Sequence, residues 1–178
     1  MLQKSSMQLV MEVFFRFPTR EHTLKEISNY SKIAHTSVKK NLQKLMKIGL
    51  IKQKIERKGT RKFPIYQAYK ENKVFIQYKK VYNLQTIMES GIINSIEEKL
   101  MPKCIVMFGS FQRGEDTEES DIDLFVEGKK EEMKLIQFEE KIGRKIQIHF
   151  KDNFISYPKE LKNNLINGIV LHGFLEGY

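Results

Sequence analysis

Apolar side chains recur every three or four residues in the first part of the chain, which is the spacing of a helix buried on one side. The stretch from Met7 to Phe17 keeps this spacing and stops at Pro18, so it predicts a first helix. Thr23 and Glu26 stand three residues apart, as in a capping box. They predict a second helix that begins there and runs to about Ser31.

A third helix is predicted next, with Gly49 in the position that commonly ends a helix. Its apolar face carries Val38, Leu42, Leu45, Met46 and Ile48. Thr36 or His35 is expected to cap its first turn. The face opposite its apolar side carries Lys39, Lys40, Gln43, Lys44 and Lys47. This helix therefore combines a buried face with a cationic one.

Two strands are predicted next, at residues 50–55 and 64–69, where apolar and polar positions alternate. The turn between them, residues 57–62, holds four cations among its six residues. The pattern therefore indicates a hairpin with a basic tip.

Residues 71–99 return to helical spacing, and Gly91 is the expected break, so a helix or a helix pair is predicted here. One face of it carries Val74, Phe75, Tyr78, Val81, Tyr82, Gln85 and Met88. We expect these side chains to face the core. A partner helix in a homodimer is the alternative.

The last part of the chain begins with a fully apolar run, residues 104–108, which predicts a buried strand. Gly109 and Ser110 are expected to form a tight turn after it. The second predicted strand, residues 120–126, places Asp121 and Asp123 on one face because side chains alternate along a strand. The acidic run between the two strands, Glu115, Asp116, Glu118 and Glu119, is expected to be a solvated loop.

Charge divides the chain into two parts. Residues 1–70 carry a net charge of +12 and residues 71–178 a net charge of −3, within an overall charge of +9. This asymmetry predicts two domains with different partners.

Composition excludes several classes of protein. The 40% hydrophobic and 30% charged residues are typical of a globular domain, and the apolar runs are too short to cross a bilayer. The start of the chain lacks the pattern of a secretory signal, so a cytoplasmic location is expected. The single cysteine, Cys104, lies in the apolar run and is expected to be a buried structural thiol.

The order of helix, capped helix, basic helix and basic hairpin over about residues 5–70 resembles the winged helix-turn-helix family. The resemblance implies binding to double-stranded DNA. Short polar side chains at the start of the recognition helix reach base edges, and cations meet phosphates. The residues that fit these roles are Thr36, Ser37, Lys39, Lys40 and Lys44 in the helix and Arg57, Lys58, Arg61 and Lys62 in the hairpin. A basic surface without a ligand is the alternative.

Two carboxylates on one face of a strand repel each other unless they share a cation. Asp121 and Asp123 therefore predict a bound Mg²⁺ ion, and such an ion would accompany a nucleoside triphosphate. Gly109 would let phosphate oxygens approach the backbone, and Ser110 could donate hydrogen bonds to them.

These motifs resemble the minimal nucleotidyltransferase branch of the DNA polymerase beta superfamily. The resemblance rests on Gly109-Ser110, Arg113-Gly114-Glu115 and Ser120-Asp121-Ile122-Asp123-Leu124, with ten residues between Ser110 and Asp121. It covers roughly residues 90–178, since residues 161–166 and 168–171 also match. It implies that Asp121 and Asp123 are catalytic metal ligands, and that Gly109, Ser110, Arg113 and Ser120 bind the nucleotide, with ATP as an expected donor.

The chain departs from this family at one position. Family members carry a third carboxylate on a later strand, and Gln147 stands at that position here. A neutral amide is a poor metal ligand and cannot accept a proton, so activity is in question. His149 shares a face with Gln147 and could act as base or ligand instead.

The sequence thus predicts an α+β protein with a winged helix domain at residues 1–70, a helical connector at 71–99 and a small mixed-sheet nucleotidyltransferase domain at 100–178. Its expected function is DNA binding together with Mg-nucleotide binding and nucleotidyl transfer. Two alternatives remain open: a nucleotide-sensing transcriptional regulator without catalysis, and an antitoxin-like protein that acts on a HEPN-type toxin.

Overall fold

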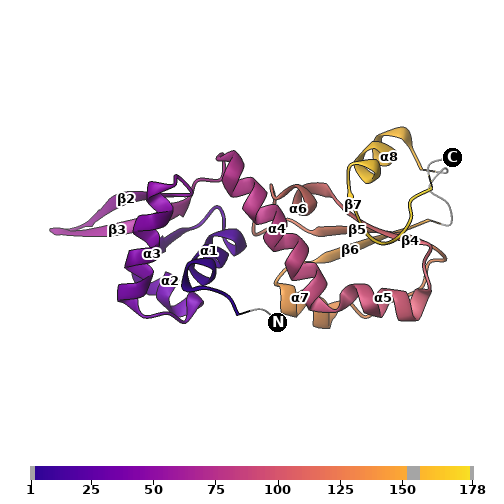
Figure 1. Cartoon of the computed structure of the whole chain (residues 1–178), viewed down its shortest axis with the longest axis horizontal. Helices are drawn as coiled ribbons and strands as arrows, with labels where there is room; N and C mark the ends of the chain where they lie inside the picture. The colour runs from indigo at the N-terminus through magenta and orange to yellow at the C-terminus, as the bar shows by residue number, and fades with distance from the viewer. Residues whose placement is uncertain (1–2, 152–156, 177–178) are drawn as a thin grey trace. The chain divides into compact units, whose positions relative to one another are not determined.

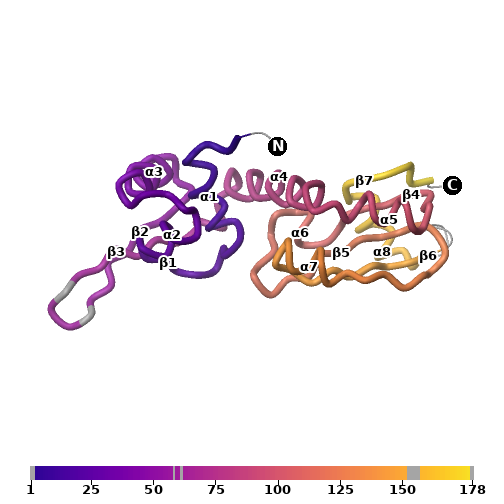
Figure 2. Tube along the Cα trace, turned by 90° about the horizontal axis from the view of Figure 1, so that it is seen from below, coloured from indigo at the N-terminus to yellow at the C-terminus, as the bar shows by residue number. Residues whose placement is uncertain are grey.

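The computed structural model describes residues 3–151 and 157–176, except for the side chains of Lys58 and Arg61. The chain has the predicted α+β fold and forms two compact units, which are coloured from indigo to yellow along the chain in Figures 1 and 2. We call them the N-terminal unit, Met1–Lys79, and the C-terminal unit, Lys80–Tyr178. In the described part of the chain, no helix combines the length and the apolar character needed to span a membrane.

The N-terminal unit consists of three helices and a three-stranded antiparallel sheet of order β1-β3-β2. Its elements are α1 Ser6–Arg16, β1 Glu21–Thr23, α2 Leu24–Ser31, α3 His35–Lys47, β2 Ile51–Lys58 and β3 Arg61–Ala68. The three predicted helices and the predicted hairpin are confirmed. Strand β1 adds to the hairpin along β3, at the register Thr23 to Ile65.

The starts of the helices show why the chain turns where it does. Thr23 forms the predicted capping box, in which its hydroxyl accepts from the Glu26 amide at 3.3 Å and Glu26 accepts from the Thr23 amide at 2.7 Å. The predicted cap of α3 is wrong, since the N-cap is Ala34. The helix begins one residue earlier than expected, so His35 and Thr36 already belong to its first turn.

The core of the N-terminal unit is formed by one buried face of each of its three helices. Phe14 of α1, Ile27 of α2 and Val38 of α3 are fully buried, as the apolar spacing predicts. The lysines on the opposite face of α3 are exposed. The sequence pattern therefore separates the buried and cationic faces of this helix correctly.

Two consecutive helices follow the hairpin, α4 Lys73–Ser90 and α5 Ile92–Leu100. The predicted break at Gly91 is confirmed, and its φ of 85° lies in the left-handed region that glycine adopts without strain. The expected buried face of α4 is largely wrong. Val74, Tyr78, Val81 and Met88 are all exposed, by 46%, 55%, 63% and 61%. Phe75 of the expected face is buried. The rest of the buried side of α4 is not purely apolar, because it combines Ile87 with the polar residues Lys79, Asn83 and Ser90.

The C-terminal unit is built on a four-stranded mixed sheet of order β6-β5-β4-β7, in which only β5 and β6 run parallel. Its further elements are β4 Cys104–Phe108, α6 Gly109–Arg113, β5 Ile122–Glu127, α7 Ile136–Ile142, β6 Ile146–Lys151, α8 Lys159–Ile166 and β7 Ile169–Gly173. The predicted mixed sheet is thus confirmed. Gly109 and Ser110 do not form a tight turn, because the positive φ of Gly109, 78°, leads directly from β4 into α6.

Both faces of this sheet are covered. On one face Ile105, Met107 and Leu124 pack with apolar residues of α4, α5 and α7. On the other, Cys104 and Val106 pack with Tyr157 and Leu165, the latter from α8. Cys104 is fully buried as predicted, and burial together with the nearby Glu127 raises the pKa of its thiol to about 11.

Candidate functional site

The two aspartates of the acidic motif lie at the beginning of β5, next to the parallel strand β6. Asp121 directly precedes β5, and Asp123 is paired in register with Gln147. Phe125 is paired with His149 in the same ladder. The parallel pairing therefore brings together the four side chains that the sequence analysis singles out on these two strands.

Each aspartate contacts one side chain of β6. The Gln147 amide donates from Nε2 to Asp121 Oδ2 at 2.5 Å. The His149 imidazole places Nε2 at 3.1 Å from Asp123 Oδ1. The Asp123 and His149 side chains remain accessible, by 28% and 35%, so a ligand can reach both.

Gly109 is required where Asp123 lies. A Cβ atom at this position would meet Asp123 Oδ2 at 2.5 Å, closer than real Cβ contacts occur. Only glycine therefore lets this carboxylate rest against the first residue of α6. Its positive φ, 78°, adds a second reason for glycine here.

The other residues expected to bind a nucleotide are Ser110, Arg113 and Ser120, and each has different surroundings. Ser110 follows Gly109 in α6 and is half-buried. Arg113 is engaged with Glu115, to whose Oε2 its Nε donates at 2.7 Å. The Ser120 hydroxyl accepts from the Thr117 amide at 2.9 Å and so belongs to the loop before β5. Of the four, Gly109 is the one that contacts an aspartate of the site.

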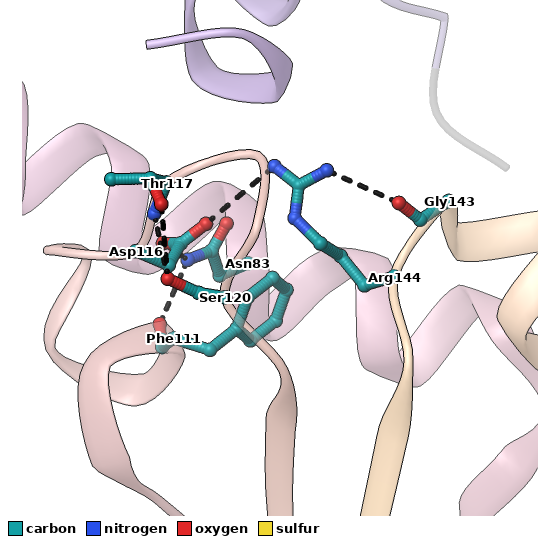
Figure 3. Close-up of polar contacts among 7 residues, drawn as sticks. All are labelled: Asn83, Phe111, Asp116, Thr117, Ser120, Gly143 and Arg144. Carbon is teal, nitrogen blue, oxygen red and sulfur yellow. Dashed lines mark hydrogen bonds and ion pairs between the residues drawn. The ribbon is translucent and has the colours of Figure 1, made fainter. Parts of the chain in front are cut away.

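A buried polar cluster beside this site was missed by the sequence analysis (Figure 3). Asn83 donates to Asp116 Oδ1 at 2.7 Å and to the Phe111 carbonyl at 2.8 Å. Arg144 places Nη2 at 3.9 Å from Asp116 Oδ2. The expectation of a solvated loop is wrong for Asp116, which is 3% exposed. Glu115, Glu118 and Glu119 of the same loop are also acidic, so the local sequence carries no signal that this one acid turns inward.

A pocket of about 520 Å³ adjoins Asp121. It is lined by Glu118, Glu119, Ser120, Asp121, Ile136, Glu139, Glu140, Gly143, Arg144 and Lys145. Glu139 is held at its wall, because its Oε1 accepts from the Ile146 amide at 3.0 Å. That hydrogen bond and the one from Lys145 lower the pKa of Glu139, so it stays ionised.

The metal-binding capacity of the site rests on two carboxylates. Within residues 3–151 and 157–176, no three His, Cys, Asp or Glu side chains are grouped so as to hold a metal ion. Gln147 occupies the place beside Asp121 where a third acid would complete such a group. The donors that remain are Asp121 and Asp123, with His149 as a neighbour of the latter.

The residues expected to bind DNA lie in the N-terminal unit. Those with exposed side chains are Thr36, Lys39, Lys40, Lys44, Arg57 and Lys62, while Ser37 is half-buried. The side chains of Lys58 and Arg61 lie outside the described part of the structure. The role of all nine residues in binding DNA stays a prediction.

Comparison with known proteins supports the assignment of the C-terminal unit. A family model described as "Nucleotidyltransferase domain" matches residues 89–172. A protein of Methanocaldococcus jannaschii, provisionally named a protein adenylyltransferase, is 43% identical over 81 residues, which span 40% of this chain and 81% of that protein. A solved structure from Methanosarcina mazei, described as a possible transcriptional regulator, is 21% identical with a TM-score of 0.37 and is matched over 54% of this chain and 76% of that one. The aspartates of β5, Gly109 and β6 all lie within the matched residues, and the chain belongs to the nucleotidyltransferase domain family.

Proposed function

We propose that the C-terminal unit binds a Mg²⁺-nucleoside triphosphate at Gly109, Asp121 and Asp123 and transfers its nucleotidyl group to an acceptor. The observation that carries this proposal is the contact between Asp123 and Gly109 at the start of α6. It brings the proposed metal ligand of β5 against the first residue of α6.

The donor set fits a magnesium ion. Mg²⁺ prefers oxygen ligands and is commonly held by one or two carboxylates together with substrate phosphates. Asp123 of β5 and Asp121, which directly precedes that strand, supply two carboxylates two residues apart. When bound there, the ion would offset the negative charge of the phosphates.

The reaction that this arrangement supports is an in-line displacement at the α-phosphorus. A hydroxyl oxygen of the acceptor forms a bond to that phosphorus, the bond to the β-phosphate oxygen breaks, and pyrophosphate leaves. The hydroxyl proton needs an acceptor, and Gln147 cannot serve. His149 is the candidate, because Asp123 lies 3.1 Å from its Nε2 and can orient the ring.

The name of a relative supports our choice of donor and acceptor classes. The name of the Methanocaldococcus jannaschii protein refers to transfer of an adenylyl group to a protein. We therefore take ATP as the donor and a protein side-chain hydroxyl as the acceptor. The identity of 43% extends over most of that relative, which supports a shared donor.

A nucleotide sensor without transfer is the second candidate, and Gln147 favours it. The amide already donates to Asp121, so it binds the carboxylate as a neutral partner and supplies no negative charge to a second metal ion. Such a domain would bind Mg-ATP and leave it intact.

For the N-terminal unit we propose a winged helix that binds double-stranded DNA. Three helices followed by the β2-β3 hairpin have the order of that fold, with α3 as the recognition helix. The proposal is supported by the exposed lysines on the face of α3 opposite the core. In this reading the nucleotide-binding unit is attached to a DNA-binding one.

Two measurements test the proposal for the C-terminal unit. Calorimetric titration with Mg-ATP should show binding to the wild-type chain, and absence of binding would refute both candidates. Incorporation of label from α-labelled ATP into proteins of a cell extract then separates transferase from sensor. We expect Gln147→Asp to raise incorporation, since it returns the third carboxylate beside Asp121. Strong incorporation by the wild type together with its loss in His149→Asn would assign the base to His149.

A further inference from the structure

The loop between α6 and β5 is anchored by a buried carboxylate (Figure 3). Asp116 is 3% exposed, and its two oxygens face different partners. Oδ1 accepts from the Asn83 amide of α4 at 2.7 Å. Oδ2 lies 3.9 Å from the Arg144 guanidinium, whose Nη1 donates to the Gly143 carbonyl at 3.1 Å.

Both charged side chains of this pair are largely removed from water. The side-chain exposure is 7% for Arg144 and 1% for Asp116. Desolvating two charges is costly, and their attraction offsets the cost only when geometry and hydrogen bonds are favourable. Such a pair therefore contributes little net stability, which raises the question of what else it does.

The pair joins the two segments that lead into the candidate site. On one side, the loop continues from Asp116 through the Thr117-Ser120 hydrogen bond directly to Asp121. On the other, Arg144 lies three residues before Gln147 at the start of β6. The Ile122 amide donates to the Lys145 carbonyl at 2.9 Å, so the two segments also meet through the backbone.

We propose that Asp116 and Arg144 are positioning residues for the Asp121-Asp123 site. Their buried pair, held to α4 by Asn83, fixes the approach of β5 against that of β6 and thereby sets the contact between Asp121 and Gln147. Supporting contacts of this kind commonly change affinity at a metal or phosphate site by about tenfold or more when they are lost. Two measurements test this proposal. The first, NMR of the Gln147 side chain, is independent of the proposed function, whereas the second, affinity for Mg-ATP, rests on it.

The first readout is the side-chain amide of Gln147, observed by ¹H-¹⁵N NMR in the full chain. Asp116→Asn keeps an acceptor for Asn83 and removes the charge, and Arg144→Gln removes the cation. We expect either variant to shift or broaden the Gln147 side-chain signals, because the contact with Asp121 is no longer held. Arg144→Lys keeps the cation without the planar guanidinium, and it decides the question if Arg144→Gln does not fold.

Two controls separate positioning from stability. Ile96→Val weakens the core of the same unit at a fully buried position, and Lys99→Gln removes an exposed cation of the same unit. Both should leave the Gln147 signals in place. Gln147 signals unchanged in all three variants of the pair, or changed equally in Ile96→Val, would overturn the proposal.

The second readout is affinity for Mg-ATP. We expect about tenfold weaker binding in Asp116→Asn and in Arg144→Gln. The double variant, Asp116→Asn with Arg144→Gln, leaves no unpaired buried charge, so its melting temperature should recover while its affinity stays low. Recovery of both quantities together would mean that the pair is structural only. If the wild type does not bind Mg-ATP, the proposed function fails, and the Gln147 signals alone decide on positioning.

Discussion

The aspartates of the C-terminal unit and the cations of the N-terminal unit differ in how far the fold fixes them. Asp121 and Asp123 each contact a named side chain of β6, and Asp123 also rests against Gly109. The lysines of α3 are exposed on the face opposite the core. If the proposed functions hold, ligand binding depends on the positions of side chains in the first region and on the total positive charge in the second. The two regions should therefore respond to different substitutions.

The largest effect is expected from the aspartates themselves. Replacing both Asp121 and Asp123 with Asn should weaken Mg-ATP binding by about 100-fold or more, because both charged oxygen ligands are lost. Isothermal titration calorimetry measures this loss directly. The matched control replaces the exposed Glu131 and Glu132 with Gln, which removes the same charge elsewhere in the unit. Binding that survives the first change would place the nucleotide elsewhere.

The proposed affinity of the β2-β3 hairpin for duplex DNA should depend on salt concentration. Replacing Arg57, Lys58, Arg61 and Lys62 with Ala should flatten the plot of log affinity for duplex DNA against log salt concentration. Each lost phosphate contact reduces the slope by about 0.9. The control removes four exposed lysines of the C-terminal unit, Lys99, Lys103, Lys129 and Lys130. Equal flattening by both sets would mean that net charge, and not the hairpin, binds the DNA.

A substitution at Gly109 tests the position of the Asp123 carboxylate while the charges of Asp121 and Asp123 are left intact. Gly109→Ala adds a methyl group where Asp123 Oδ2 lies, and it strains a positive φ. We expect about tenfold weaker Mg-ATP binding and a loss of about 1 kcal/mol in stability. Gly91→Ala is the control, because Gly91 has a similar φ of 85° and nothing within 4 Å of the added Cβ. It should lower stability comparably and leave affinity unchanged.

The smallest effect concerns the thiol of Cys104, the first residue of β4. Its pKa is raised to about 11, above that of an exposed thiol, so the unfolded chain loses the proton at lower pH than the folded one. The stability that the buried neutral thiol contributes is therefore present below about pH 8.5 and is lost as the pH rises toward 11. Urea unfolding from pH 8 to 10.5 should show a decline that is shallower in Cys104→Ala. Parallel curves for the two chains would contradict this assignment.

The sequence predicted most of the fold, because its signals were local. The capping box at Thr23, the break at Gly91 and the apolar run of β4 each specify the element in which they occur. The choice of buried face on α4 failed for a physical reason. The buried side of that helix includes the polar residues Lys79, Asn83 and Ser90, so apolar spacing does not identify it and tertiary packing selects it.

The candidate site was predicted only in part, because only some of its residues belong to a local sequence motif. Asp121, Asp123 and Gly109 stand in one contiguous motif. Gln147 follows from the resemblance to the family, and His149 from strand alternation. Asn83, Asp116 and Arg144 come from three distant segments and meet only in the folded chain. No local pattern marks Asp116 as the one inward-facing acid of its loop.

Helix α4 contributes to both units, since the boundary between them falls at Lys79, within its residues Lys73–Ser90. A helix advances by about 100° per residue, so its side chains keep their places only while the residue count is unchanged. One residue inserted between Asn83 and Ile87, which are both buried in the C-terminal unit, would rotate the two side chains by about 100° relative to each other. The part of α4 that packs within the C-terminal unit therefore tolerates no change in residue number, and insertions and deletions there should be selected against far more strongly than in a flexible linker.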